Sequence, residues 1–117
     1  MRTSTTTSEV RLMAINTCKG WMFFRHDDIV RIEAVSNYCK IHFAKGHPLT
    51  VAKLLYWFEH RLPRDNFYRI HRTHIVNRLF VADIPSEKLV ELSNGEQLQV
   101  SRRKKGELGR MAMITRL

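Results

Sequence analysis

The chain has 117 residues, 44% of them hydrophobic, which fits one domain with its own core and excludes general disorder. It carries 20 lysines and arginines against 11 aspartates and glutamates, and the net charge of +9 indicates a polyanionic partner. No apolar run is long enough to cross a membrane and no secretory leader is visible, so we expect a cytoplasmic protein.

The first part of the chain predicts a tail followed by short strands. Residues 1–9 have Thr or Ser at six positions and no periodic pattern, so we expect a flexible tail and a domain over residues 10–117. Runs of apolar and β-compatible residues then alternate with turn residues, as in hairpins. The expected strands are residues 10–18, 21–24, 29–35 and 39–43, and the expected turns are 19–20, 36–38 and 45–48.

One segment before the final basic run has a helical period. Val51, Leu54, Leu55 and Phe58 recur at i, i+3, i+4 and i+7 and predict a short helix that packs on the core. A recognition helix in a DNA groove is the alternative. It would bring acidic Glu59 close to phosphates, and no second helix lies near enough in sequence for a helix-turn-helix.

The second part predicts more antiparallel strands. Residues 67–70 and 79–84 fit strands, and residues 89–100 fit a hairpin around an Asn-Gly pair. A two-residue turn would place glutamines beside leucines. A three-residue loop with Gly95 in the left-handed conformation pairs Val90 with Leu98 instead, and we prefer this register. Residues past Lys105 predict a short C-terminal helix, so the expected fold is mainly antiparallel all-β with one short central helix.

Two basic segments follow expected strands. Residues 67–77 read Phe-Tyr-Arg-Ile-His-Arg-Thr-His-Ile-Val-Asn, and residues 100–105 read Val-Ser-Arg-Arg-Lys-Lys. Each begins as a strand and then accumulates side chains suited to phosphate oxygens and base edges. Either segment alone could be a solvated surface, but the matching positions of the two predict a DNA-reading surface made of loops.

The order of these features resembles the LytTR family, the DNA-binding output domain of many bacterial response regulators. The resemblance covers roughly residues 10–108. It rests on five matches: Ile32-Glu33-Ala34 followed by Asn37-Tyr38, the helix with Leu54 and Leu55, the segment 67–77, Asn94-Gly95, and Val100-Ser101-Arg102-Arg103.

The resemblance implies a regulator of transcription that binds duplex DNA. Family members recognise short direct repeats through successive major grooves, bend the DNA and bind as two copies. They commonly carry an upstream receiver domain, and this chain has none, so we expect either a stand-alone regulator or a domain cut from a longer one.

Candidate base-reading residues come from three places. Arginine offers a planar fork of donors that matches guanine, which favours Arg72 and Arg103. The family pattern maps onto the same two arginines and onto the loop that follows residues 32–34, without choosing among its members. The candidates for base contact are therefore Asn37, Tyr38, Lys40, Arg72 and Arg103, with Cys39 as a further loop member.

Other polar side chains of these regions are expected to hold phosphates, which fixes register without reading sequence. These are Lys53, Arg69, His71, Ser101, Arg102 and Lys104. His74 and Asn77 are expected to belong to the scaffold, with Asn77 bonding its own backbone at a turn.

Other functions find little support in the sequence. No nucleophile with a base, carboxylate pair or Gly-rich phosphate loop indicates an enzyme, and no cofactor or small-molecule substrate is indicated. The His71-x-x-His74 spacing lacks a third metal ligand, and Cys18 and Cys39 are expected to be buried thiols. An RNA-binding module is the alternative, but only Tyr38 and Tyr68 could stack bases; a basic protein-interaction domain is another.

Overall fold

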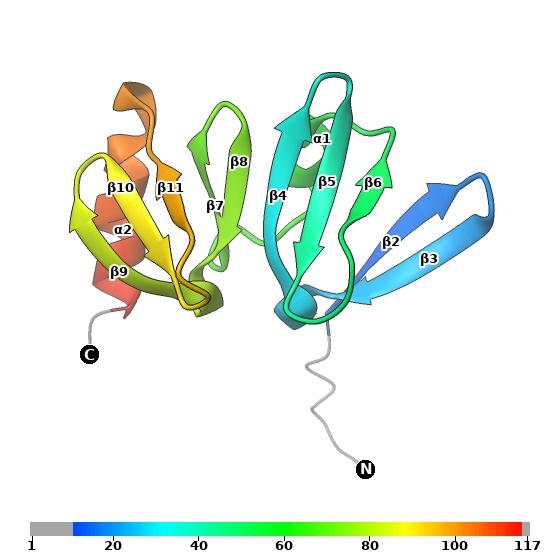
Figure 1. The fold of residues 1–117 in the computed structure, drawn as a ribbon, viewed down its shortest axis with the longest axis horizontal. Coiled ribbons are helices and arrows are strands. Elements are labelled where there is room, and N and C mark those ends of the chain that lie inside the picture. Colours follow the sequence, from blue (N-terminus) through cyan, green and yellow to red (C-terminus); the bar gives the residue numbers. More distant parts are fainter. Residues whose placement is uncertain (1–10, 116–117) are drawn as a thin grey trace, which may run out of the picture.

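The computed structural model describes residues 11–115, with side chains described through Met111, so the expected tail lies outside the described residues. Short strands dominate this part of the chain, and two α-helices and three-residue helical turns accompany them (Figure 1). The elements are β2 (Leu12–Thr17), β3 (Gly20–Arg25), η1 (His26–Asp28), β4 (Ile29–Val35), β5 (Tyr38–Phe43), β6 (Leu49–Val51), α1 (Leu55–Glu59), β7 (Phe67–His71), β8 (His74–Asn77), η2 (Arg78–Phe80), β9 (Val81–Ser86), β10 (Leu89–Leu92), β11 (Gln97–Gln99), η3 (Arg102–Lys104) and α2 (Lys105–Thr115).

The strands of residues 11–115 form three antiparallel sheets. The central sheet has the order β6-β5-β4-β8-β7, the hairpin β2-β3 lies at one end, and the sheet β11-β10-β9 lies with α2 at the other (Figure 1). All strand pairs within these sheets are antiparallel, which confirms the expected fold class.

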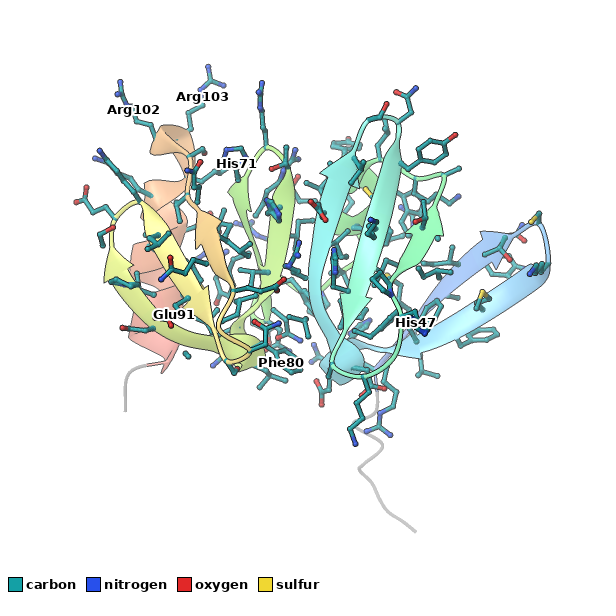
Figure 2. All side chains as sticks on the ribbon, in the orientation of Figure 1. His47, His71, Phe80, Glu91, Arg102 and Arg103 are labelled. Atoms are coloured by element: carbon teal, nitrogen blue, oxygen red, sulfur yellow. The ribbon has the colours of Figure 1, made fainter. Side chains whose placement is uncertain are left out.

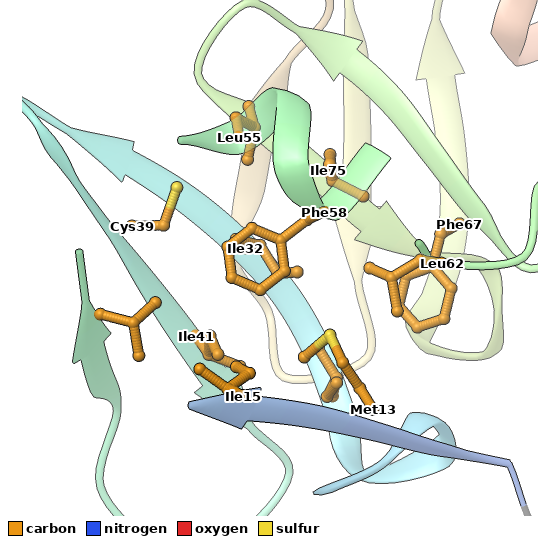
Figure 3. Close-up of a cluster of buried hydrophobic side chains, with 12 residues drawn as sticks. Met13, Ile15, Ile32, Cys39, Ile41, Leu55, Phe58, Leu62, Phe67 and Ile75 are labelled. Carbon is orange, nitrogen blue, oxygen red and sulfur yellow. The ribbon is translucent and has the colours of Figure 1, made fainter. Parts of the chain in front are cut away.

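Two hydrophobic cores lie on the two faces of the central sheet. In the first, Phe58 of α1 packs with Ile32, Ile41 and Ile15, and the hairpin β2-β3 closes this core (Figure 3). The second core lies between the β7 side of the central sheet, the three-stranded sheet and α2, and it buries Tyr68. Burying so many large apolar side chains supplies the main favourable term in folding.

The central helix is shorter than its sequence pattern predicts. Val51 ends strand β6, where it pairs with Cys39, and Leu54 precedes α1 with 62% of its surface exposed. The apolar spacing therefore spans two elements, the end of strand β6 and the short helix α1. Leu55 and Phe58 are buried, which confirms that α1 packs on the core.

Strand β8 was not predicted, because the whole stretch after Ile70 was expected to form a loop. Only Arg72 and Thr73 form the turn, and the chain then returns as β8 between β4 and β7. Ile75 belongs to the first core and Val76 to the second. A strand covered on both faces lacks the alternation of polar and apolar residues that marks a half-buried strand.

Other expectations are confirmed. Val90 pairs with Leu98 across a three-residue loop, and Gly95 has a φ of 93°. The C-terminal helix is present as α2, which buries Leu108 and Met111. No helix of the described part is both long and apolar enough to span a membrane.

An ion pair connects the central sheet to the three-stranded sheet. Arg31 of β4 is 8% exposed, and its Nε and Nη2 donate to the Glu96 carboxylate at 3.1 and 3.0 Å. These hydrogen bonds lower the pKa of Glu96 to about 2. The contact adds an anchor across a boundary that is otherwise packed with apolar side chains.

Candidate nucleic-acid interface

Three polar segments lie at one edge of the molecule because the strands that lead to them run in the same direction. Strand β8 is antiparallel to both β4 and β7, so β4 and β7 end at the same edge. There β4 turns into β5 at Ser36–Asn37, and β7 turns into β8 at Arg72–Thr73. The end of β11 leads into η3 at this edge as well, where Arg102 and Arg103 project outward (Figure 2). We call these three segments the reading edge.

The Arg72 turn is braced from below by Arg69. The Arg69 guanidinium donates to the Arg72 carbonyl at 2.9 Å and to the His71 carbonyl at 3.4 Å, and it pairs with Glu59 of α1 at 2.8 Å. Arg69 is half-buried, whereas Arg72 is exposed. Arg69, an expected phosphate contact, thus has its donors directed at the protein itself.

A chain of hydrogen bonds also fixes this turn. The Thr73 amide donates to Nδ1 of His71 at 3.2 Å, so that nitrogen is an acceptor. The Thr73 hydroxyl lies 2.8 Å from the same atom and 2.9 Å from Nδ1 of His74. We therefore assign the hydroxyl as donor to His71 and His74 as donor to the hydroxyl.

His74 fits this chain as a neutral imidazole. Burial, and after it the nearby Arg31 charge, lowers the pKa of His74 to about 4, although Glu33 opposes the shift. Glu33 bonds His42 at 2.9 Å, and its own pKa is lowered by that hydrogen bond against the opposing effect of burial. His74 thus belongs to the scaffold at neutral pH.

The segment that carries Arg103 is held by its backbone. The Ser101 amide donates to the Ile70 carbonyl at 2.8 Å, and the Lys104 amide donates to the Ser101 carbonyl at 2.9 Å. Within the described part of the chain, the side chains of Arg102 and Arg103 make no hydrogen bond or ion pair, and both are exposed. Lys104 and Ser101 are half-buried at the junction with α2.

The β4–β5 turn places Asn37 and Tyr38 at the reading edge, whereas the side chain of Cys39 faces the core. Ser36 has a φ of 55°, which lets the chain reverse within two residues, and Asn37 and Tyr38 are exposed. Lys40 is half-buried, two residues into β5. Cys39 is fully buried against the first core and burial raises its pKa to about 11, so this side chain does not face the edge.

Two further residues with expected roles are Lys53, a proposed phosphate contact, and Asn77, an expected scaffold residue. Lys53 lies between β6 and α1, with its Nζ 5.0 Å from the Trp57 ring centroid, and this segment also lies toward the reading edge (Figure 1). Asn77 is 1% exposed. Its Nδ2 donates to the Ile29 carbonyl at 2.8 Å and its Oδ1 accepts from the Leu79 amide at 2.9 Å, which confirms a bond to its own turn.

The two cysteines differ in exposure. Cys39 is buried as expected, whereas Cys18 lies exposed in the hairpin turn, where the expectation was wrong. Both are free thiols. Among residues 11–115, His, Cys, Asp and Glu form no group of three that could hold a metal ion.

A family model for the LytTr DNA-binding domain matches residues 19–113. The chain belongs to the LytTR DNA-binding domain family. It is similar to a solved structure from Bacillus cereus, the LytTr DNA-binding domain of a protein described as a response regulator. The TM-score is 0.71 at 24% identity over 91% of this chain and 97% of that one, which shows the shared fold. No curated protein matches the chain.

Family membership makes this LytTR domain a DNA-binding domain of a kind found in response regulators. The exposed arginines at the reading edge are of the residue type that suits phosphate and base contacts. Sequence reasoning missed the bracing by Arg69 and Thr73. Nothing in the sequence could have revealed it, because Glu59 reaches Arg69 only through the packing of α1 on the central sheet.

Proposed function

We propose that this LytTR domain regulates transcription by binding a specific duplex DNA sequence through the reading edge. Arg72 and Arg103 read guanines from two successive major grooves, and the turn with Asn37, Tyr38 and Lys40 reads a third position. The convergence of three strand-end segments at one edge is the observation that carries this proposal.

The dimensions of the molecule support contact with successive grooves. The reading edge runs along the longest axis of Figure 1, and the whole molecule, including the hairpin β2-β3 beyond that edge, extends 41 Å along it. One helical turn of DNA is about 34–36 Å, so one domain can approach neighbouring grooves on one side of the duplex. Two copies would then occupy direct repeats along one face, and the DNA would bend toward them.

Phosphate contacts complete the proposed interface. The basic or hydroxyl side chains that flank the reading segments fit this role, whereas Arg69 supports the Arg72 turn instead. The proposed phosphate contacts are Lys53, His71, Ser101, Arg102 and Lys104.

The RNA alternative loses its main support. A stacking platform needs exposed aromatic rings, and of the two candidates Tyr68 is completely buried. Tyr38 is 51% exposed, so the two tyrosines expected from the sequence do not form a stacking platform together.

The proposal is tested first by selecting preferred sites from random duplexes and then by comparing two substitutions on the selected site. Arg103→Ala should lose about 1–3 kcal/mol of discrimination at one base position, because one bidentate pair disappears. Lys104→Ala should weaken binding to all sequences alike and reduce the salt slope by about one unit.

Lys19→Ala serves as the control, because Lys19 is exposed in the β2–β3 turn, away from the reading edge. It should leave specificity unchanged and affect affinity only slightly. If Arg103→Ala and Lys104→Ala weakened all sequences equally, the division between base and phosphate contacts would be wrong. Selection of no preferred duplex would remove the proposal as a whole.

A further inference from the structure

The hairpin β2-β3 has one face that the described residues 11–111 leave exposed. Its inner face carries Met13 and Ile15, both buried in the first core. Its outer face carries Leu12, Trp21 and Phe23, which are 54%, 62% and 63% exposed. Adjacent exposed side chains of this size mark an interaction surface more often than chance.

The pairing of the two strands fixes how this outer face is arranged. Trp21 pairs with Asn16, Phe23 with Ala14 and Arg25 with Leu12, so these six side chains share the face. Along β3 the order is Trp21, Phe23, Arg25, with neighbours about 7 Å apart because each lies two residues from the next. Phe23 therefore lies midway between an aromatic ring and a cation.

A hollow adjoins the Arg25 end of this face. It has a volume of about 510 Å³ and is lined by Phe23, Arg25, Asp28, Phe43 and Lys45 among others. That volume lies within the range of pockets that accept aromatic groups. The two cations on its rim favour the face of an indole ring.

We propose that this face is a self-association surface that binds a second copy of this chain. A two-fold axis across the strands at Phe23 stacks Phe23 on Phe23 of the second copy. The same axis brings Trp21 of each copy to Arg25 and the adjoining hollow of the other. The surface is complementary to itself, as a two-fold interface requires.

The pairing of aromatic rings with cations supports a second copy as the occupant. Each Trp21 meets a cation of the other copy in a favourable cation–π contact, and the interface contains two such contacts. The two Arg25 side chains lie at opposite ends of the interface, roughly 14 Å apart along the strands, which exceeds the Debye length of about 8 Å at physiological salt. The two Arg25 side chains are thus separated, and each faces an aromatic ring.

Analytical ultracentrifugation of the full chain without DNA tests the proposal. A reducing agent is present throughout because Cys18 is an exposed thiol. The average mass should rise from 13.8 kDa toward twice that value as the concentration increases toward the millimolar range. Phe23→Asp should raise the dissociation constant at least tenfold, and Arg25→Glu should do so by a smaller factor.

Leu79→Asp is the matched control, because Leu79 is 54% exposed in η2, outside the hairpin. It should leave the dissociation constant unchanged. Circular dichroism checks that each variant is folded. A wild-type chain that stays at 13.8 kDa at every concentration would overturn the proposal, and so would an equal effect of Phe23→Asp and Leu79→Asp. DNA binding is measured separately, so failure here leaves the proposed function untouched.

Discussion

The two arginines that we propose as base readers are positioned by different physical means. Arg72 sits on a two-residue turn that Arg69 and the His71–Thr73–His74 chain brace with side-chain hydrogen bonds. Arg103 sits on a helical turn that backbone hydrogen bonds and the packing of α2 hold in place. One edge of one domain therefore depends on polar side chains at one reader and on apolar burial at the other.

Because of this difference, Arg72 and Arg103 should lose their positions through different kinds of substitution. A polar network fails when a donor, an acceptor or a protonation state changes, without loss of the fold. A helix docked by apolar side chains fails when packing is lost, and its failure also reduces stability. Substitutions away from the DNA should therefore affect the two readers independently.

The largest expected effect comes from loosening α2. Leu108→Ala should lower the free energy of unfolding by about 2–5 kcal/mol, because Leu108 is buried in the second core beneath the segment that carries Arg103. Urea unfolding measures the loss. Discrimination at the base read by Arg103 should fall, while discrimination at the base read by Arg72 should persist under conditions where the domain is still folded.

Leu79→Ala is the control for this change, since Leu79 is exposed and its truncation should cost less than about 0.5 kcal/mol. Equal loss of discrimination at both bases in Leu108→Ala would show that the two readers are not independent.

A smaller effect is expected at the other reader. Arg69→Met removes the donors to the Arg72 carbonyl and to Glu59, and should cost about 1–2 kcal/mol of discrimination at the base read by Arg72. In an Arg72→Ala background the same change should cause little further loss of discrimination, because the side chain that the braced turn presents is already absent. Binding to duplexes altered at single positions measures both quantities.

Arg61→Met is a matched control for Arg69→Met. The Arg61 guanidinium stacks over Trp57 at 4.2 Å and contacts no residue of the reading edge. Full additivity of Arg69→Met and Arg72→Ala would instead indicate that Arg69 contacts DNA directly, as the sequence had predicted.

The last expected effect is a dependence of stability on pH that arises at the braced turn. The pKa of His74 is lowered to about 4 in the folded state, mainly by burial, against an ordinary value of 6.5. Between these values the unfolded chain binds the proton and the folded chain does not, so the free energy of unfolding should fall as the pH falls from 6.5 to 4. Above pH 6.5 this group contributes no pH dependence.

His74→Gln should flatten that dependence when urea midpoints are compared across the same pH window. The pKa of His26 is also lowered by burial, but His26 is present in both proteins and cancels in the difference. His47→Gln, a change at an exposed position, should keep the wild-type slope. Parallel curves for His74→Gln and the wild type would rule out His74 as the source.

Local features of the fold could be predicted from the sequence where neighbours in the chain decide them. The register of Val90 opposite Leu98 follows from keeping glutamines away from leucines and from a glycine that tolerates positive φ. Both residues lie within one hairpin, so no distant segment enters the argument. The C-terminal helix was likewise predictable from residues within α2.

Features that depend on distant segments were missed. Strand β8 carries no alternation because both of its faces are buried: Ile75 packs in the first core with α1, and Val76 packs in the second core with the three-stranded sheet and α2. The helix predicted from the spacing of Val51 to Phe58 is longer than the observed α1, because Val51 pairs with Cys39 in the sheet. At the site, the exposure of Arg72 and Arg103 agrees with their expected roles, whereas the inward direction of Arg69 depends on Glu59 and could not be foreseen.

The burial of β8 between two cores has a consequence for how the domain folds. β8 pairs with β4 across roughly forty residues of chain, with Ile32 opposite Ile75, and neither core can close until that pair has formed. Closing so long a loop costs entropy before any contact rewards it, so folding should take milliseconds to seconds. Amide hydrogens of β8 should then exchange only through global unfolding, and their rates would report the stability of the whole domain.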